Sequence, residues 1–346
     1  MAEADGNNGR TATGPVPRLS VAVLNYNYGK YLPFCIESIL KQSFTDFEVI
    51  ILDDCSTEDF AAVTAKLPRD PRVRVVRHAI NRGFVDSLIE VTEEFSRGEF
   101  VTVISADDFV LDPDAFKKQI ALLDGDPNMA LCFGAHDRVD SVTLRSYDVH
   151  RPFPEDRVME GVEFGRMMLA SIEVQVLHSG AMLRASAYRA SGGYRRDMRY
   201  CVDTAMWLTI PLFGSVGYSA SVLYAYRSHE SQMSTGFASV LPTMRETRAA
   251  LESVFRIAQR RRVDLGITLT DALRVYLPAM AVADAFADRK KACVMRLVAN
   301  LQVDGFVALS SRRFWIAGLR LALGDTGYRA LQGALGRGTL PPKSAA

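Results

Sequence analysis

The 346-residue sequence has few cysteines, and their arrangement excludes the sites that cysteine usually builds. The five are Cys35, Cys55, Cys132, Cys201 and Cys293. Their number is odd, they are scattered, and no two form a Cys-x-x-Cys pair, so neither a disulfide framework nor a zinc site is indicated. A reducing compartment is the simplest interpretation, which predicts a cytoplasmic protein.

Long apolar runs are also lacking. No stretch of about 18 uncharged apolar residues occurs; the best attempt, 275–286, is short and contains Asp284, so we expect no membrane-spanning helix. Residues 1–18 are rich in Gly, Asn, Thr, Ala and Pro and have no apolar segment. They therefore do not resemble a signal peptide, and we expect a disordered tail.

An excess of charge of one sign is absent as well. The formal net charge is +1, from 41 basic and 40 acidic residues, so no strong field favours nucleic acid or another polyanion. Apolar residues make up 48% of the chain and charged residues 23%, as in ordinary soluble globular proteins. The length allows one large catalytic domain and a smaller appendage.

Strand-like and helix-like segments alternate from residue 19 to about 135. We expect strands at 19–24, 48–52, 73–76, 100–104 and 129–133, and helices at 31–42, 57–67, 86–95 and 112–123, the last with Pro113 in its first turn. Strands that are apolar throughout, separated by helices, predict an α/β fold with a mainly parallel sheet covered on both faces.

Polar clusters follow three of these strands. They are Asn25-Tyr26-Asn27, Asp53-Asp54 and Asp107-Asp108. Sheets of this class bind ligands at the carboxyl ends of their strands, so the three clusters predict one site at one edge of the sheet.

The remainder of the chain gives a weaker pattern. Residues 136–180 look irregular, 181–190 and 203–213 look helical, 218–226 could be a strand, and 240–335 look entirely helical. We therefore divide the chain into a tail (1–18), a catalytic domain (19–239) and a helical C-terminal region (240–346). Within the catalytic domain we expect two halves, 19–108 and 109–239.

Three segments together resemble family 2 glycosyltransferases. They are 19–27 (LSVAVLNYN), 46–57 (DFEVIILDDCST) and 97–109 (RGEFVTVISADDF), and the similarity returns at 179–182 (SGAM), at Asp203 with Trp207-Leu208, and at 226–229 (YRSH). The resemblance covers about residues 18–235. It implies a GT-A fold and transfer of a sugar, with inversion, from a nucleotide diphosphate donor to an acceptor hydroxyl.

Asp107 and Asp108 suit a metal. Glycosyl transfer expels a nucleoside diphosphate, and a divalent cation neutralises the charge that develops on it. Mg²⁺ and Mn²⁺ accept one or two carboxylates, with phosphates and waters completing the shell. The resemblance implies that Asp108 holds the metal and Asp107 the ribose or donor sugar, although Ala106 replaces the first acid of the family's Asp-x-Asp. The alternative is that either aspartate caps the following helix.

Asp54 is the candidate for orienting the nucleotide base. A carboxylate accepts the N3–H of uracil or thymine, and the resemblance assigns this contact to Asp54. Tyr26 could stack on the base, with Asn25 and Asn27 making polar contacts beside it. The alternatives are helix capping by Asp53, Ser56 or Thr57 and an ordinary buried tyrosine.

Two further residues enter through the same resemblance. Arg82, in Asn81-Arg82-Gly83, could meet a phosphate, since Gly83 permits a tight turn there; the alternative is a solvated arginine. His229 matches a family histidine that joins the metal or touches the diphosphate; the alternative is a structural histidine.

Asp203 is the proposed catalytic base. An acceptor hydroxyl loses its proton as it attacks the anomeric carbon, and a nearby carboxylate can take that proton. The family places an acidic residue before an apolar helix with a Trp-Leu-like pair, matched here by Asp203 and Trp207-Leu208. Val202 stands where many members have a second acid, and an N-capping role is the alternative.

Several partners follow from this interpretation. We expect a nucleotide-sugar donor, a glycan, lipid-linked or other hydroxyl acceptor, Mn²⁺ or Mg²⁺ as cofactor, and no nucleic acid. The basic and aromatic residues at 260–262 and 312–316 could lie on an anionic membrane at the inner face, or form a solvated helix face; homo-oligomerisation stays open. The alternative functions are a catalytically silent nucleotide-sugar-binding protein and a nucleotidyltransferase. A nucleotidyltransferase is expected to have a Gly-rich basic loop after the first strand, and this sequence lacks one.

Overall fold

The computed structural model describes residues 15–229, 240–286 and 289–334. Most of the expected tail and the expected boundary at residue 239 therefore lie outside the described residues. The chain forms two compact units. The first unit contains the chain up to Phe164 together with Gln175–Met198 and Thr209–Glu230, and the second unit contains Gly165–Val174, Arg199–Leu208 and the chain after Ser231.

The first unit is built on one ten-stranded sheet. Its main strand order is β3 (Val73–Arg77), β2 (Phe47–Asp53), β1 (Leu19–Asn25), β4 (Phe100–Ser105), β9 (Met182–Arg184), β6 (Met129–Asp140), β10 (Ser215–Ser228) and β5 (Phe109–Val110). Strands β7 (Ser146–His150) and β8 (Arg157–Met159) pair with β6 and β10.

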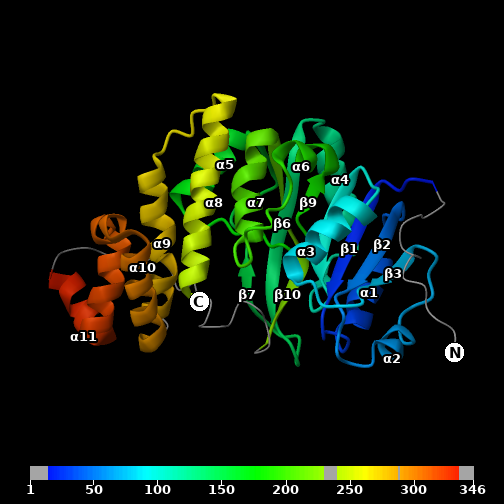
Figure 1. Cartoon of the computed structure of the whole chain (residues 1–346), viewed down its shortest axis with the longest axis horizontal. Coiled ribbons are helices and arrows are strands. Elements are labelled where there is room, and N and C mark those ends of the chain that lie inside the picture. Colours follow the sequence, from blue (N-terminus) through cyan, green and yellow to red (C-terminus); the bar gives the residue numbers. More distant parts are fainter. Residues whose placement is uncertain (1–14, 230–239, 287–288, 335–346) are drawn as a thin grey trace. The chain divides into compact units, whose positions relative to one another are not determined.

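Strand direction divides this sheet. Strands β3, β2, β1 and β4 are parallel neighbours, which Figure 1 shows for β1 to β3. β9 is antiparallel to both β4 and β6, while β5, β7 and β8 pair in antiparallel fashion with β10 or β6. The sheet is therefore mixed: the strands within residues 19–108 are parallel as expected, and those that follow combine one parallel pair, β6 with β10, with antiparallel pairs.

Apolar side chains cover both faces of the parallel strands. Every residue of β1 and β2 is buried, which explains why neither strand alternates polar and apolar residues. Alternate residues such as Val21 and Ile51 join a core with α1 (Leu32–Leu40), α2 (Phe60–Thr64) and α4 (Ala115–Gly125). Helix α3 (Phe84–Glu90), continued by a π-helical turn at Val91–Phe95, contacts β1 and β2.

Helix ends differ from the expected ones for local reasons. Asp59 caps α2 by accepting a hydrogen bond from the Ala62 amide, so Asp53, Ser56 and Thr57 are not its caps. Helix α4 begins after Asp114, which places Pro113 before the helix rather than in its first turn. Arg18, placed in the expected tail, forms ion pairs with Asp124 and Glu99.

The region expected to be irregular, 136–180, contains regular elements. There the chain continues β6 and forms β7, β8 and α5 (Gly161–Ala170), while residues 181–190, expected to be helical, form β9 and then α6 (Ala185–Ser191). Strand β7 is mostly exposed or half-buried, so it carries no apolar run that could identify it. Pairing with β6 rather than burial therefore fixes this strand.

The second unit is helical, as expected after residue 240. It contains α8 (Val240–Arg261), α9 (Leu269–Phe286), α10 (Lys290–Ser310) and α11 (Arg312–Ala334), preceded by most of α7 (Val202–Thr209), while the short 3₁₀ turn Ile210–Phe213 belongs to the first unit. Small side chains such as Ala281, Cys293 and Ala317 form a core between α9, α10 and α11. Among the described helices, α10 is long and apolar enough to span a membrane, a criterion that core helices of soluble proteins also meet.

The first testable prediction concerns the parallel core. Ile51 is fully buried and pairs in register with Val75, which is 42% exposed. Ile51→Ala should lower the free energy of unfolding by about 2–4 kcal/mol, because a buried cavity forms. Val75→Ala, its cross-strand control, should change it by less than about 1 kcal/mol. Urea titration measures both, and equal losses would contradict this packing.

Candidate active site

The polar clusters meet at one edge of the sheet. In the strand register Asn25 pairs with Asp53, Asp53 pairs with Arg77, and Leu24 pairs with Ser105. The residues that follow these four parallel strands therefore lie along the same edge. The sequence-based expectation of a single polar edge is confirmed.

The turn after β1 is tied to the turn after β2. The Asn25 side-chain amide donates to Asp53 Oδ1 at 2.6 Å. Asn27 has a φ of 60°, a left-handed conformation that asparagine tolerates, and its backbone amide donates to Ser56 Oγ at 2.8 Å. Asn25 and Asn27 thus hold the two turns together. Tyr26 stays 43% exposed between them, so it is available for stacking and is not the buried tyrosine of the alternative.

Asp54 anchors the turn after β3. Its Oδ1 accepts from the Arg82 amide at 2.8 Å and lies 2.7 Å from His78 Nδ1, while Oδ2 accepts from the Gly83 amide at 2.7 Å. Burial raises the pKa of Asp54, but the hydrogen bonds from Arg82, His78 and Gly83 outweigh it, so the pKa lies below its ordinary value. Asp54 is therefore an ionised acceptor at neutral pH.

Sequence reasoning missed the histidine beside Asp54. His78 directly follows β3, and its side chain is only 4% exposed. Its Nε2 lies 2.8 Å from Glu90 Oε2, which also accepts from Arg82 Nη1 at 2.8 Å. The Arg82 guanidinium thus has a carboxylate partner while remaining half-exposed. Only the position of His78 at a strand's carboxyl end could have signalled it.

Asp107 combines burial with an unused oxygen. It is 5% exposed, and its Oδ2 lies 3.0 Å from His229 Nε2. Its Oδ1 is buried with no hydrogen-bond partner among the described residues. Burial raises the pKa of Asp107, and the hydrogen bond to His229 offsets part of that rise. An orphaned carboxylate oxygen beside an imidazole suits a cation.

Asp108 is occupied by the protein itself. Its Oδ2 accepts from the Ser179 hydroxyl, and its Oδ1 accepts from the Arg227 amide at 3.0 Å. Burial and the adjacent Asp107 charge hold the pKa of Asp108 well above its ordinary value. Strand β5 follows the pair, so neither aspartate caps a helix, and that alternative is excluded.

Aromatic rings surround His229. The ring centroids of Tyr28 and Tyr31 lie 5.4 Å and 5.3 Å from that of His229. The guanidinium of Arg227 lies over Tyr31, 5.2 Å from its centroid, and also over two phenylalanines. These tyrosines were not predicted, although they belong to the turn after β1. Together they fix the imidazole next to Asp107.

The donor set fits a hard divalent cation. No group of three or more His, Cys, Asp or Glu side chains gathers within the described ranges. Asp107 and His229 would supply two ligands to such an ion, and Mg²⁺ or Mn²⁺ bound beside a diphosphate would take the rest from phosphate oxygens and water. The fit is supported by Asp107 Oδ1, a buried oxygen that has no hydrogen-bond partner among the described residues.

Asp203 belongs to the second unit. It is the second residue of α7, it is half-buried, and its Oδ1 accepts from the Thr204 amide at 2.6 Å. Within this unit Glu246 of α8 accepts from the amides of Tyr200 and Cys201 at 2.6 Å and 3.0 Å, which anchors the chain just before α7. Asp203 lies inside the helix rather than before it, so it is not the N-cap of the alternative.

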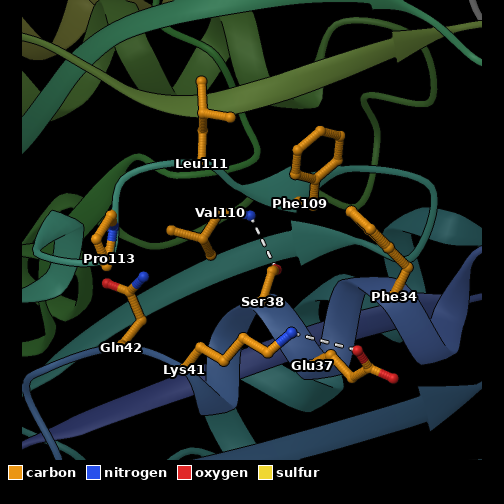
Figure 2. A pocket seen from close by; sticks show the side chains of 9 residues that line it. All are labelled: Phe34, Glu37, Ser38, Lys41, Gln42, Phe109, Val110, Leu111 and Pro113. Carbon is orange, nitrogen blue, oxygen red and sulfur yellow. Dashed lines mark hydrogen bonds and ion pairs between the residues drawn. The ribbon is translucent and has the colours of Figure 1, made fainter. Parts of the chain in front are cut away.

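A separate cavity lies between α1 and β5. It has a volume of 280 Å³ and is lined by residues including Phe34, Ser38, Phe109 and Leu111 (Figure 2). Ser38 Oγ accepts from the Val110 amide at 3.0 Å at its centre. None of its lining residues is one of the predicted site residues. The cavity therefore does not define the candidate site.

Comparison with known families matches the chain from β1 to β9 and α6. Residues 20–190 match the model of the family described as Glycosyl transferase family 2. This range includes every predicted residue of the candidate site except Asp203 and His229.

Curated proteins give the same indication. Residues of this chain are 28% identical over 211 positions to a chondroitin synthase from Escherichia coli, covering 60% of this chain and 29% of that protein. They are 39% identical over 93 positions to the glycosyltransferase GlyG from Streptococcus pneumoniae, covering 27% of this chain and 31% of that protein. The chain thus spans about a third of the length of these relatives.

Solved structures show the same fold. S. aureus TarS 1-349 in complex with UDP-GlcNAc has a TM-score of 0.62 at 17% identity, covering 94% of this chain and 93% of that one. The mannosyltransferase PcManGT from Pyrobaculum calidifontis, in complex with GDP-Man and Mn²⁺, has a TM-score of 0.50 at 16% identity, covering 93% and 88%. At these identities the likeness shows the fold alone, which is the GT-A fold.

Proposed function

Residues 20–190 belong to glycosyl transferase family 2, and we propose that the chain transfers a sugar from a uridine or thymidine diphosphate donor to an acceptor hydroxyl with inversion. The observation that carries the proposal is the shared edge of the sheet, where Asp54 follows β2 and Asp107 follows β4 on either side of β1, with His229 beside Asp107. One end of this edge offers an ionised acceptor for a base, and the other offers ligands for a metal.

We assign the metal to Asp107 and His229, with Asp108 as their support. Sequence resemblance gave Asp108 the metal, but both oxygens of Asp108 already accept hydrogen bonds from Ser179 and Arg227. Asp107 keeps a buried oxygen without a partner among the described residues. A bound cation would supply charge neutralisation for the departing diphosphate. Asp108 would orient the 107–108 turn instead, and Arg82 would reach a phosphate through guanidinium nitrogens other than the Nη1 that Glu90 holds.

The second testable prediction separates the two aspartates. Asp107→Asn should weaken UDP binding in Mn²⁺ by about 10- to 100-fold, because it removes a charged ligand. Asp108→Asn should weaken it by much less, because asparagine can still accept from the Arg227 amide and donate to Ser179. Calorimetric titration with and without Mn²⁺ measures both. A larger loss in Asp108→Asn would return the metal to Asp108.

Asp54 would read the edge of the base. An ionised carboxylate accepts the N3–H of uracil or thymine, whereas N3 of cytosine and N1 of adenine carry lone pairs that it repels. Its lowered pKa keeps it ionised, which makes this discrimination available at neutral pH. Tyr26 lies exposed nearby for stacking, with Asn25 and Asn27 holding its turn.

The third prediction concerns the donor class. Thermal unfolding in Mn²⁺ should shift upward more with UDP or dTDP than with CDP or ADP at equal concentration, because stabilisation by a ligand grows with its affinity. In Asp54→Asn the ratio of the CDP Kd to the UDP Kd should shrink by about tenfold, since a charged hydrogen bond is lost. Equal shifts for all four nucleotides in the wild-type protein would refute the base assignment.

Asp203 is proposed as the base that takes the acceptor proton. Its support is chemical: a half-buried carboxylate at the start of an apolar helix, whose preceding residues Glu246 holds in place. Because Glu246 of α8 holds the residues just before α7, we propose that the region after residue 240 positions α7 in addition to serving assembly.

The fourth prediction tests that role. Asp203→Asn keeps the side chain's shape but removes its basicity, so the transfer rate should fall by about 10²–10⁴-fold while the UDP Kd stays within about threefold. Transfer from UDP-sugars to a saccharide acceptor and UDP titration are measured on the same preparation. A rate close to wild type would assign the proton to another group, and a large loss of UDP affinity would move Asp203 into the donor site.

We further propose a glycan acceptor in cell-surface polysaccharide synthesis, since relatives include chondroitin and hyaluronan synthases. Peripheral docking on a membrane through the C-terminal helices stays a prediction. Its support is the exposed apolar series Val294, Met295, Val298 and Leu301 on α10, which begins at Lys290 and Lys291. A cytoplasmic location and homo-oligomerisation also stay predictions.

A further inference from the structure

We infer that His78 and Glu90 are positioning residues that hold the Asp54 carboxylate in one orientation and thereby set the nucleotide selectivity of the donor site. The inference rests on the proposed function, because it takes Asp54 as the reader of the base. It concerns residues that neither the motifs nor the family resemblance singles out. All of them lie in the first unit.

The Asp54 carboxylate has one acceptor position to spare. Its two oxygens offer about four lone-pair positions in all. The described residues fill three: His78 Nδ1 and the Arg82 amide at Oδ1, and the Gly83 amide at Oδ2. The remaining position is on Oδ2. A base that donates at this point is accepted, and one that presents a lone pair is repelled.

His78 can hold Asp54 only if its own ring is held. An imidazole ring can flip and can move its proton between nitrogens, and a neutral ring donates from one nitrogen only. Here both nitrogens lie within 2.8 Å of a carboxylate oxygen, Nδ1 at Asp54 and Nε2 at Glu90. A contact at each nitrogen holds the ring against flipping and keeps Nδ1 facing Asp54. Glu90 therefore secures the donor that Asp54 receives.

The contacts close into a ring. Glu90 Oε2 also accepts from Arg82 Nη1, and the Arg82 amide returns to Asp54 Oδ1. The backbone supports the ring at two points. The His78 amide donates to the Asp53 carbonyl at 2.9 Å, and Gly83 has a φ of 88°, which favours glycine. Rotation of the Asp54 carboxylate would break three hydrogen bonds together.

Without Glu90, the His78 ring loses the carboxylate that holds Nε2. The ring could then turn so that Nδ1 leaves Asp54 Oδ1, and the Arg82 and Gly83 amides alone would hold the carboxylate. The base edge would meet an acceptor whose orientation varies. Uracil and cytosine would then bind with similar affinity, although the fold of the sheet would not depend on this change.

Two substitutions at His78 provide the fifth prediction. In His78→Asn the amide nitrogen replaces Nδ1 and can still donate to Asp54, whereas in His78→Gln the amide reaches the place of Nε2 and contacts Glu90. The ratio of the CDP Kd to the UDP Kd, measured in Mn²⁺ by calorimetry, should stay within about threefold of wild type in His78→Asn. It should fall by about tenfold or more in His78→Gln, since a charged hydrogen bond is lost.

Glu90 gives a second matched pair. The side-chain amide introduced by Glu90→Gln can donate to His78 Nε2, which leaves a neutral ring donating Nδ1–H to Asp54, so the ratio should be kept. Glu90→Leu removes the anchor and should lower the ratio as His78→Gln does. Glu48→Leu is the control for general destabilisation. Glu48 is a buried carboxylate bonded to Ser20 and Arg97 near the amino end of β2, and its loss should lower the unfolding temperature but not the ratio.

The outcomes separate this inference from the proposed function. No preference of the wild-type protein for UDP over CDP would refute the role of Asp54 itself. A wild-type preference that Asp54→Asn abolishes, but that folded His78→Gln and Glu90→Leu both keep, would overturn the positioning role alone. If His78→Gln does not fold, Glu90→Leu against Glu90→Gln decides. Equal ratios in that pair would contradict the inference.

Discussion

The burial of carboxylates at one edge of the sheet is the constraint on which the site depends. Asp54, Asp107 and Asp108 are 4%, 5% and 3% exposed. Burying an ionised carboxylate costs several kcal/mol of folding free energy unless hydrogen-bond donors or cations replace the water that it loses. The protein meets this requirement differently at each position: with backbone amides and an imidazole at Asp54, with His229 at Asp107, and with a hydroxyl and an amide at Asp108.

The three carboxylates differ in their charge state and in what they can still bind. Asp54 is stabilised in its charged form, so its pKa is lowered and it stays an acceptor. Asp108 is not compensated to the same degree, and its pKa is raised by burial and by Asp107. Between them Asp107 keeps one oxygen that no described group satisfies. Of the three, Asp107 is the carboxylate that keeps a buried oxygen open to a bound cation.

The sequence could predict the parallel half of this arrangement because its signals are local. Apolar strands that end at or just before Asn25, Asp54 and Asp107 identify both the sheet and its polar edge without any tertiary information. His78 and Glu90 could not be found this way, because a single histidine after β3 and a glutamate on α3 acquire meaning only when the turn at Gly83 brings them together. The exposed strand β7 was missed for a related reason, since its partner rather than its composition defines it.

The Ser-Gly-Ala segment shows how a weak motif gains a physical explanation. Gly180 has a φ of 110°, and an added Cβ would lie 2.3 Å from the Tyr224 ring, so no larger residue fits there. Its amide donates to the Val103 carbonyl, and Ser179 forms a β-bridge with Val103. The glycine thus lets the chain approach β4 closely enough for the Ser179 hydroxyl to reach Asp108. The same contact that offsets the burial of Asp108 leaves that carboxylate occupied, and for this reason the open oxygen of the pair belongs to Asp107.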